Sequence, residues 1–168
     1  MASQEQLTRR RTIEWDDPVA LAAEAAGRSG LDFLRAIAGG ELPPPPISRL
    51  TQLSVLEVEE GRVVFRITPH ESMYNPIGAI HGGMHATVLD GAMGCAVHTT
   101  LPAGVGYTTL EIKVNYVRPF RVDSGPAIAE GVVLHRGSRQ ATAEGRLTRE
   151  SDGKLLAHAT TTCILLGG

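Results

Sequence analysis

The stretch from His81 to Leu101 constrains the fold of this 168-residue chain more than any other segment. It is rich in alanine, methionine, leucine and valine, and it contains no proline before Pro102, so we predict a helix over its whole length. The apolar residues lie on all sides of this helix rather than in a single stripe. The helix must therefore be buried on most of its faces, which requires the rest of the chain to wrap around it.

Runs with the character of β-strands stand on both sides of this helix. Before it, Leu53 to Val58 and Arg62 to Thr68 are separated by Glu59-Glu60-Gly61, a spacing that is typical of a hairpin. Four more strand-like runs follow the helix, and they are Tyr107 to Val117, Ala127 to Leu134, Arg139 to Thr148 and Leu155 to Leu165. This order predicts an α+β fold in which an antiparallel sheet wraps around a central helix.

Two short helices are predicted near the N-terminus. Asp16-Asp17-Pro18 can start a helix that continues through Val19 to Ala26, because an aspartate caps free N–H groups and proline is tolerated in the first turn. A second amphipathic piece runs from Leu31 to Ile37, and Gly39-Gly40 ends it.

These helices are set apart from the main body of the chain by proline. We expect Pro43 to Pro46 to form a stiff polyproline spacer, and Arg9-Arg10-Arg11 to belong to a solvated tail. The chain thus divides into an N-terminal extension over residues 1–48, with short helices and a proline-rich linker, and a main domain over residues 49–168.

The composition excludes several classes of function. The formal net charge of −2 provides no basic field that would hold nucleic acid or an anionic membrane. Cys95 and Cys163 lie in apolar runs, which favours buried thiols in a reducing compartment over a disulfide framework. We find no apolar stretch of membrane-spanning length and no signal-peptide core. The sequence therefore predicts a cytoplasmic globular protein.

The start of the central helix carries the sequence His81-Gly82-Gly83. Paired glycines let a ligand approach backbone N–H groups that have no partner in the first turn. These groups, at the positive end of the helix dipole, suit a carbonyl oxygen that gains negative charge during a reaction. The alternative is that the glycines only allow the helix to pack tightly against the sheet.

Asp90 is the only Asp, Glu, Lys or Arg between His85 and Glu111. A carboxylate in the middle of a buried helix is costly unless it is paired, hydrogen-bonded or functional. We therefore favour a functional carboxylate over a structural aspartate that caps a loop.

The spacing of Gly82 and Asp90 has a consequence for the assembly. Eight residues of helix separate them by about 12 Å at 1.5 Å per residue. A base or nucleophile must approach the reacting atom to about 3 Å, and the oxyanion donors must touch the same group. Two copies of the helix, antiparallel across a two-fold axis, would bring the start of each to the middle of the other. The spacing therefore predicts a dimer with shared sites.

The motifs together resemble a known family. Asn75-Pro76-x-Gly78-x-x-His81-Gly82-Gly83, then Asp90, Tyr107-Thr108-Thr109-Leu110 and Asn115-Tyr116-x-Arg118-Pro119 are similar to those of the hotdog-fold acyl-CoA thioesterases. The phenylacetyl-CoA type, within the 4-hydroxybenzoyl-CoA thioesterase superfamily, matches best. The resemblance covers roughly Leu50 to Leu166.

The resemblance implies a role for each matching residue. Asp90 corresponds to the carboxylate that attacks the thioester or activates water, and Gly82 to the glycine whose N–H polarises the carbonyl. Asn75 corresponds to the asparagine that positions the carbonyl or water, while His81 supports the helix start. Thr109 falls where relatives carry a hydroxyl that orients the water. In such relatives Asn75 and Gly82 come from one subunit, and Asp90 and Thr109 from the other.

The strand around Thr109 also predicts the direction of its side chain. Leu110 and Ile112 belong to an alternating pattern that predicts one buried and one wetter face. Strand parity then places Thr109 on the face opposite to both of them.

The resemblance also implies the substrate and the assembly. An acyl-CoA would be the substrate, no metal or redox cofactor would be needed, and the family forms dimers that often pair into tetramers. The turn Arg136-Gly137-Ser138-Arg139 offers N–H groups and two guanidiniums for the coenzyme A phosphates, and Arg118 and Arg121 are further candidates. The alternative is that these are ordinary surface arginines. The N-terminal extension could be a lid over the acyl tunnel or an oligomer contact.

Three other functions are compatible with the sequence. His81 and His85 have the i, i+4 spacing of helical metal ligands, with Asp90 or His98 as a third ligand, although the glutamate of the common zinc motif is missing. The same fold can also hydrate or dehydrate acyl thioesters. A non-catalytic acyl-CoA-binding protein is the third alternative, but binding alone would not need a buried carboxylate.

Overall fold

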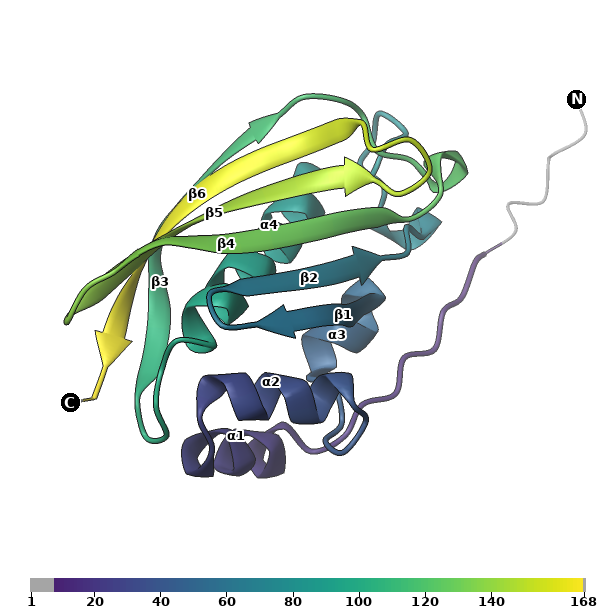
Figure 1. The fold of residues 1–168 in the computed structure, drawn as a ribbon. Helices are drawn as coiled ribbons and strands as arrows, with labels where there is room; N and C mark the ends of the chain where they lie inside the picture. The colour runs from purple at the N-terminus through teal and green to yellow at the C-terminus, as the bar shows by residue number, and fades with distance from the viewer. Residues whose placement is uncertain (1–7, 168) are drawn as a thin grey trace, which may run out of the picture.

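Six strands and one long helix form the body of the molecule (Figure 1). The computed structural model describes residues 8–167. In chain order the elements are α1 (Pro18–Gly27), α2 (Gly30–Ala38), α3 (Pro46–Thr51), β1 (Leu53–Glu59), β2 (Arg62–Ile67), a 3-10 turn (Glu71–Met73), α4 (Gly82–His98), β3 (Gly106–Tyr116), a 3-10 turn (Val122–Ser124), β4 (Ala127–Arg136), β5 (Gln140–Arg149) and β6 (Leu155–Leu166).

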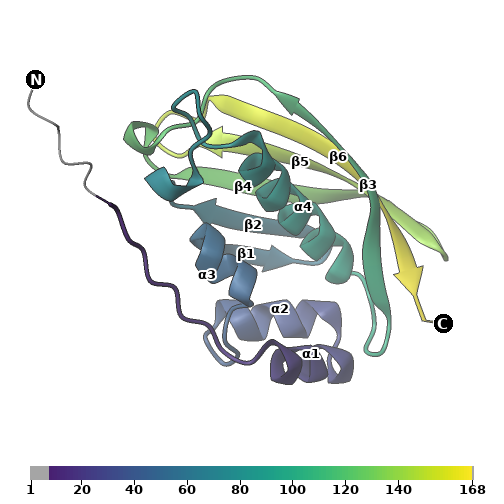
Figure 2. The same ribbon diagram turned by 180° about the vertical axis from the view of Figure 1, so that it is seen from behind.

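All strand pairs are antiparallel, and the strands lie in the order β1-β2-β4-β5-β6-β3. The sheet curves, and α4 crosses its concave face in contact with every strand (Figure 2). The prediction of an α+β fold with an antiparallel sheet around a central helix is therefore confirmed. The helix is slightly shorter than predicted, since His81 is its N-cap and Thr99 its C-cap.

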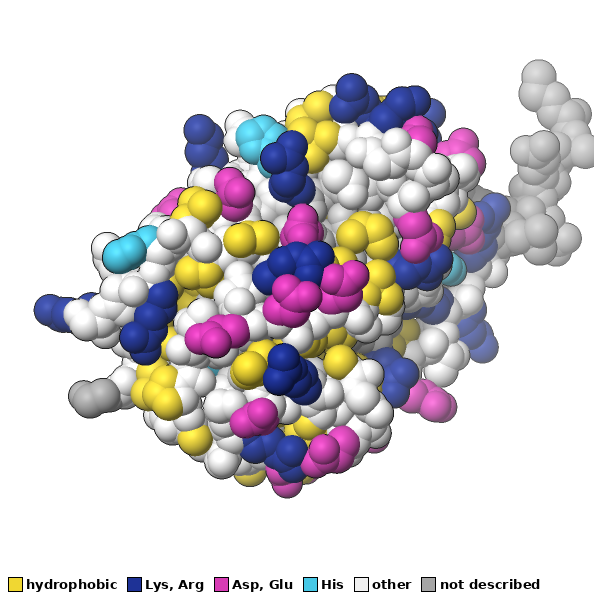
Figure 3. All heavy atoms as spheres, in the orientation of Figure 1, with side chains coloured by type: hydrophobic (Ala, Val, Ile, Leu, Met, Phe, Trp, Pro, Cys, Tyr) yellow, Lys and Arg dark blue, Asp and Glu magenta, His cyan; other side chains and the backbone are white. Residues whose placement is uncertain are grey.

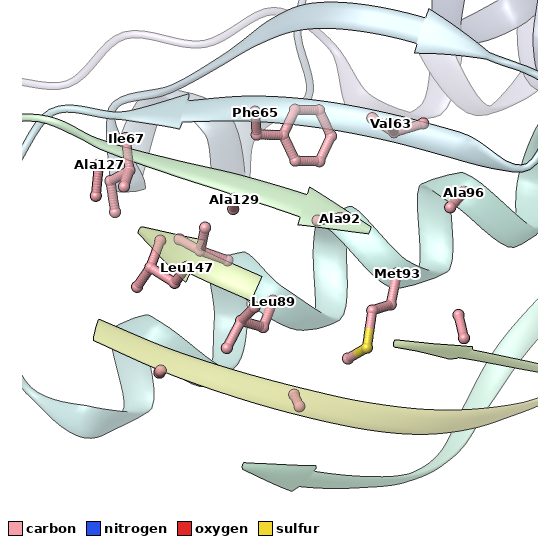
Figure 4. Packing of buried hydrophobic residues seen from close by; sticks show 14 of the residues in the cluster. Val63, Phe65, Ile67, Leu89, Ala92, Met93, Ala96, Ala127, Ala129 and Leu147 are labelled. Atoms are coloured by element: carbon pink, nitrogen blue, oxygen red, sulfur yellow. The ribbon is translucent and has the colours of Figure 1, made fainter. Parts of the chain in front are cut away.

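The helix lies close to the sheet because small residues face it. A Cβ atom at Gly131 in β4 would overlap the backbone carbonyl of Ala92, and one at Gly145 in β5 would lie 2.9 Å from Met93 Cγ. These two glycines lie directly opposite each other in neighbouring strands, so together they form a depression in the face of the sheet that packs against α4. Leu89 and Met93 are fully buried there (Figure 4). Burial of such large side chains supplies most of the stability of this layer.

The opposite face of the sheet carries ion pairs. In Figure 3, basic and acidic side chains lie next to one another on this surface, among apolar and uncharged ones. Arg62 lies 2.7 Å from Glu57 and 2.6 Å from Glu130, and Arg66 lies 2.8 Å from Glu150. The sheet is thus covered on one side by α4 and faces water on the other, as expected for an antiparallel sheet.

The two predicted N-terminal helices are present. The Asp17 side chain accepts a hydrogen bond from the Val19 amide at the start of α1, and Gly39 caps the end of α2. The two helices lie beyond β1 and the C-terminal end of α4 (Figures 1 and 2). The Gly30 amide donates to the Leu101 carbonyl at 3.0 Å, and the Phe33 and His98 rings are 5.8 Å apart. The extension is therefore packed against the end of the central helix.

One expectation for the extension was wrong. Pro46 does not continue the polyproline spacer but begins α3, because proline fits the first position of a helix. Arg9 and Arg10 are exposed, as expected for a solvated tail, although Arg9 also forms an ion pair with Glu71, and the half-buried Arg11 donates to Ser72 Oγ at 3.2 Å. The predicted boundary between residues 48 and 49 falls inside α3, and residues 1–7 lie outside the described chain.

One side of α4 is left open by the sheet. Gly83 and Thr87 are exposed, and Asp90 and Gly91 are half-buried. Over these turns no other element of residues 8–167 lies in front of this side of the helix (Figure 2). Toward the end of the helix the side is partly covered, because Tyr107 packs on Gly94 and on His98. In the single chain, therefore, α4 is buried on the side that faces the sheet, and the prediction that it is buried on most faces holds for that side only. No helix among the described residues is long and apolar enough to span a membrane.

Candidate active site

Asp90 lies in the middle of the open side of α4. Its carboxylate accepts a hydrogen bond from Thr109 Oγ1 in β3 at 2.8 Å. Within residues 8–167 no lysine, arginine or histidine forms an ion pair with it. The carboxylate is therefore held by one hydroxyl and keeps lone pairs that can accept a further proton or hydrogen bond.

Thr109 reaches Asp90 because β3 is irregular and does not keep a strict alternation of its two faces. The register with β6 shifts between Thr109 and Glu111, so Leu110 forms a bulge and is 59% exposed. A bulge reverses the alternation beyond it. Thr109 and Ile112 therefore share the face toward α4, and the placement of Thr109 opposite Ile112, with Leu110 buried, was wrong.

The start of α4 leaves one backbone amide without an acceptor. His81 is the N-cap, and its Nδ1 atom accepts from the Gly83 amide at 2.9 Å. The Met84 amide donates to the His81 carbonyl at 2.9 Å. For the Gly82 amide, residues 8–167 provide no acceptor. Its N–H is thus free to donate to a ligand at the positive end of the helix dipole.

Asn75 organises the loop in front of this amide. Its Oδ1 atom accepts from the amides of Ile77 and Ala79, both at 3.1 Å. The side-chain NH₂ group has no acceptor within the described chain and is available to a ligand. Asn75 and Gly82 line one cavity of about 340 Å³, together with His85, Tyr116 and Arg118.

The structure therefore brings the five candidate catalytic residues together in two groups. Asn75, His81 and Gly82 lie at the start of α4, whereas Asp90 and Thr109 lie at its middle. The two groups are eight helical residues apart, or about 12 Å along the axis. One chain does not bring both groups to a single carbonyl.

The buried titratable groups on and beside α4 are neutral at ordinary pH. Burial raises the pKa of the Cys95 thiol to about 12 and raises the pKa of the Tyr107 hydroxyl well above its usual range. Burial lowers the pKa of His85 and His98. Cys95 is therefore a protonated thiol rather than a nucleophile, because the thiolate is the reactive form.

The arginines proposed for coenzyme A lie in two separate places. Arg118 lines the cavity with Asn75 and Gly82, and its guanidinium donates to the Leu155 carbonyl at 2.8 Å. Arg136, Gly137, Ser138 and Arg139 form the β4–β5 turn, where both arginines are exposed and the Gly137 amide donates to the Gln140 carbonyl at 2.9 Å. This turn lies at the C-terminal end of β4, the strand that begins at Ala127.

The histidines of the alternative metal site do not converge. The His81 ring caps α4, whereas the His85 ring packs against Tyr116 and Phe120 at 5.7 and 5.8 Å. The His98 ring lies between Phe33 and Tyr107. Among residues 8–167 no group of three or more His, Cys, Asp or Glu side chains is placed to hold a metal ion.

Two tyrosines near the site were not singled out by the sequence. The Tyr116 hydroxyl donates to the Gly82 carbonyl at 3.1 Å, and its ring packs on the glycine, where a Cβ atom would lie 3.2 Å away. Tyr107 packs in the same way on Gly94 of α4. Both residues lie in the quoted β3 motifs, but only their pairing with glycines of α4 reveals these contacts.

Known proteins share this architecture. Residues 77–156 match the family model described as the thioesterase superfamily. The chain is 33% identical to the protein SSO2140 of Saccharolobus solfataricus, whose name refers to an esterase, over 67% of this chain and 78% of that protein. It is 27% identical to human acyl-coenzyme A thioesterase 13, over 64% of this chain and 76% of that enzyme.

A solved structure shows the same arrangement in three dimensions. The phenylacetic acid degradation-related protein of Ralstonia eutropha JMP134 superposes with a TM-score of 0.70 and 27% identity, over 77% of this chain and 97% of that one. The family model, the sequence relatives and the shared fold agree, and this chain belongs to the thioesterase superfamily, with its hotdog fold.

Proposed function

We propose that this chain is an acyl-CoA thioesterase that hydrolyses a thioester to a carboxylic acid and coenzyme A. The observation that carries the proposal is the Asp90 carboxylate, held by Thr109 at 2.8 Å on the open side of α4 with no cation beside it in the described chain. A carboxylate in this setting is available as a nucleophile or as a general base. Membership of the thioesterase superfamily supports the reaction class.

Each candidate residue has a defined task in the proposed reaction. The thioester carbonyl oxygen accepts a hydrogen bond from the Gly82 amide, with Asn75 beside it. In one route Asp90 takes a proton from water as the water oxygen adds to the carbonyl carbon, and the C–S bond of the tetrahedral intermediate then breaks. In the other route an Asp90 oxygen adds to the carbonyl carbon, the C–S bond breaks to leave an acyl-aspartyl anhydride, and water then hydrolyses this anhydride. In both routes coenzyme A leaves as the thiolate and is protonated. Thr109 orients the carboxylate and the water.

We propose that the site is completed by a second copy of the chain. The two edges of the sheet differ, because β1 is covered by α2 and α3, whereas β3 is paired only with β6 within residues 8–167. An unpaired eleven-residue edge strand is a ready template for another strand. Pairing two β3 strands about a two-fold axis would bring the open sides of the two α4 helices together. Gly82 of one copy would then approach Asp90 of the other.

The same assembly gives the arginines a role. We propose that Arg118 and the Arg136–Arg139 turn bind the phosphates of coenzyme A, since guanidiniums suit phosphate oxygens and both turn arginines are exposed. Their separation within one chain is compatible with a site built from two chains. The pairing of dimers into a tetramer is proposed from the resemblance only.

Asp90→Asn tests the catalytic assignment directly. The substitution keeps the size of the side chain but removes its basicity, so we expect kcat to fall by about a hundredfold or more. Turnover is measured as free thiol released from a panel of acyl-CoA esters, from acetyl-CoA to palmitoyl-CoA. The matched control is Asp123→Asn, an exposed aspartate in the turn before β4.

Two outcomes would overturn the proposal. A folded Asp90→Asn protein with the turnover of the wild type would exclude Asp90 as the catalytic carboxylate. A wild-type protein that binds acyl-CoA tightly but releases no thiol would be the non-catalytic binder that the sequence left open.

A further inference from the structure

Tyr107 lies one helical turn beyond Asp90, on the same side of α4. Its ring packs on Gly94, where a Cβ atom would lie 3.0 Å from both the hydroxyl oxygen and the ring. Asp90 and Gly94 are four residues apart, or about 6 Å along the helix. Tyr107 and Thr109 are two residues apart in β3, so both point toward α4. The tyrosine therefore stands beside the candidate site.

The Tyr107 ring also lines a cavity that none of Asp90, Gly94 and Thr109 lines. It has a volume of about 310 Å³ and is lined by Tyr107, His98, the Gly104–Gly106 loop, and Ala25 and Ala26 of α1. The Tyr107 and His98 rings are 5.4 Å apart, and His98 also packs against Phe33 of α2. The N-terminal helices thus form part of the wall, although they lie outside the residues matched by the family model.

The part of α4 that leads from Asp90 to this cavity is suited to an apolar group. Between Asp90 and His98 the helix carries no charged residue, and Gly91, Gly94 and Cys95 are small. Burial keeps the pKa values of Cys95 and Tyr107 high, so both are neutral. In the other direction the helix leads to the polar groups of Thr87 and His81. An acyl group gains free energy from contact with the apolar side only.

We propose that Tyr107 is the end wall of the acyl site and limits the length of the acyl group. This inference rests on the proposed thioesterase function. Along α4, Asp90 and the Gly94 on which the ring packs are about one helical turn apart, and an acyl group laid along the helix from Asp90 to the ring would be a short chain or one aromatic ring. Tyr107 lines the cavity against α1 and packs on Gly94, so loss of its ring would open a path from the site toward this cavity. Tyr107 is thus a specificity-determining residue rather than a catalytic one.

Tyr107→Ala tests this role against Tyr107→Phe. We expect Tyr107→Ala to raise the ratio of kcat/KM for decanoyl-CoA over acetyl-CoA by roughly tenfold or more, because several methylene groups find an apolar pocket. Tyr107→Phe keeps the ring and the wild-type ratio. If Tyr107→Ala does not fold, as judged by circular dichroism, Tyr107→Leu shortens the wall with less loss of packing and carries the same expectation.

A second substitution shows whether the gain comes from this cavity. Ala25→Phe, added to Tyr107→Ala, fills the cavity from the α1 side and should remove most of the gain. Ala23→Phe is the matched control, since residues two apart on a helix face different directions and Ala23 does not line the cavity. It should leave the gain intact. Equal ratios for Tyr107→Ala and Tyr107→Phe, or no difference between the two phenylalanines, would overturn the proposal.

Binding separates this inference from the proposed function. Dissociation constants for decanoyl-CoA and acetyl-CoA are measured by calorimetry in the Asp90→Asn background, with and without Tyr107→Ala. The ratio of the two constants should shift by roughly tenfold in favour of decanoyl-CoA even if no turnover is found. The outcome that contradicts the end-wall role alone is a wild-type protein that hydrolyses acyl-CoA while Tyr107→Ala changes neither the kcat/KM ratio nor the ratio of dissociation constants for decanoyl-CoA and acetyl-CoA.

Discussion

Asp90 differs in its surroundings from the acidic residues that are ion-paired on the outer face of the sheet. The acids on the outer face of the sheet, such as Glu130 and Glu150, are paired with arginines. Asp90 has Thr109 as its hydrogen-bond partner and neutral Cys95 and Tyr107 nearby. A carboxylate without a neutralising cation is a stronger base and nucleophile than one in an ion pair. This setting favours a chemical role over a structural one.

Thr109→Val should separate the hydroxyl from the shape of the side chain. Valine keeps the volume but cannot donate to Asp90, and hydrogen bonds to charged groups contribute about 1.5–3 kcal/mol. We therefore expect kcat to fall by about tenfold to a hundredfold, while Thr109→Ser retains most of the activity. Steady-state kinetics on the best acyl-CoA ester, with circular dichroism as the folding control, checks this. Equal activity in the two variants would contradict a role for the hydroxyl.

At the scale of elements, the contact between α2, α4 and β3 joins the N-terminal extension to the central helix. His98 lies in this contact, between the rings of Phe33 and Tyr107. A Cβ atom at Gly30 would overlap the backbone of His98, so the start of α2 is fitted tightly to the end of α4. The extension is thus a packed layer against the helix end, and it forms one wall of the cavity beyond Tyr107.

This contact predicts a dependence of stability on pH. Burial lowers the pKa of His98 in the folded state, whereas an unfolded histidine binds a proton near pH 6.5. Below about pH 6.5 the unfolded state therefore binds more protons, and the free energy of unfolding falls as the pH falls toward the folded pKa. His85 contributes in the same direction. His98→Gln should weaken this dependence but not abolish it.

Urea unfolding at pH 7.5 and pH 5.5, at one protein concentration, measures the effect. The loss of unfolding free energy between the two pH values should be smaller in His98→Gln than in the wild type. An equal loss in both proteins would show that His98 does not titrate differently in the folded state.

At the scale of the whole molecule, the open side of α4 and the edge strand β3 are neighbours on the same side of the fold, since Thr109 of β3 contacts Asp90. The β1 edge is covered by the chain's own helices, so the two edges are not equivalent. Exposed apolar residues, including Leu110 and Tyr116, belong to β3. Burial of this region in a symmetric dimer would cover the apolar residues and bring together the two groups of the proposed site.

Mixing two inactive variants tests the shared site. Asp90→Ala removes the carboxylate, and Gly82→Pro removes the free N–H at a helix position that tolerates proline. After subunit exchange, half of the dimers are mixed and each has one intact site of two, so we expect about a quarter of the wild-type activity. Mass spectrometry of differently tagged subunits confirms the exchange. Confirmed exchange without recovery of activity would contradict a site built from two chains.

Much of the fold could be predicted because its signals are local. The absence of proline from His81 to Leu101, the aspartate and proline before α1 and the glycines after α2 act within a few residues, and the helices form where these signals place them. The sequence around the central helix also contained the motif of the candidate site. Spacing alone indicated that Gly82 and Asp90 of one chain do not meet.

The rest depends on contacts between distant parts of the chain. The direction of Thr109 follows from a bulge in the pairing of β3 with β6. The start of α3 at Pro46 is an exception, because its signal is local but lies within a run of prolines. The wall formed by Tyr107 exists only because Gly94 of α4 leaves room for its ring and α1 lies behind it. Periodicity and caps determined the elements from the sequence, whereas strand register and close packing of small residues, which involve partners far apart in the chain, decided which side chains surround Asp90.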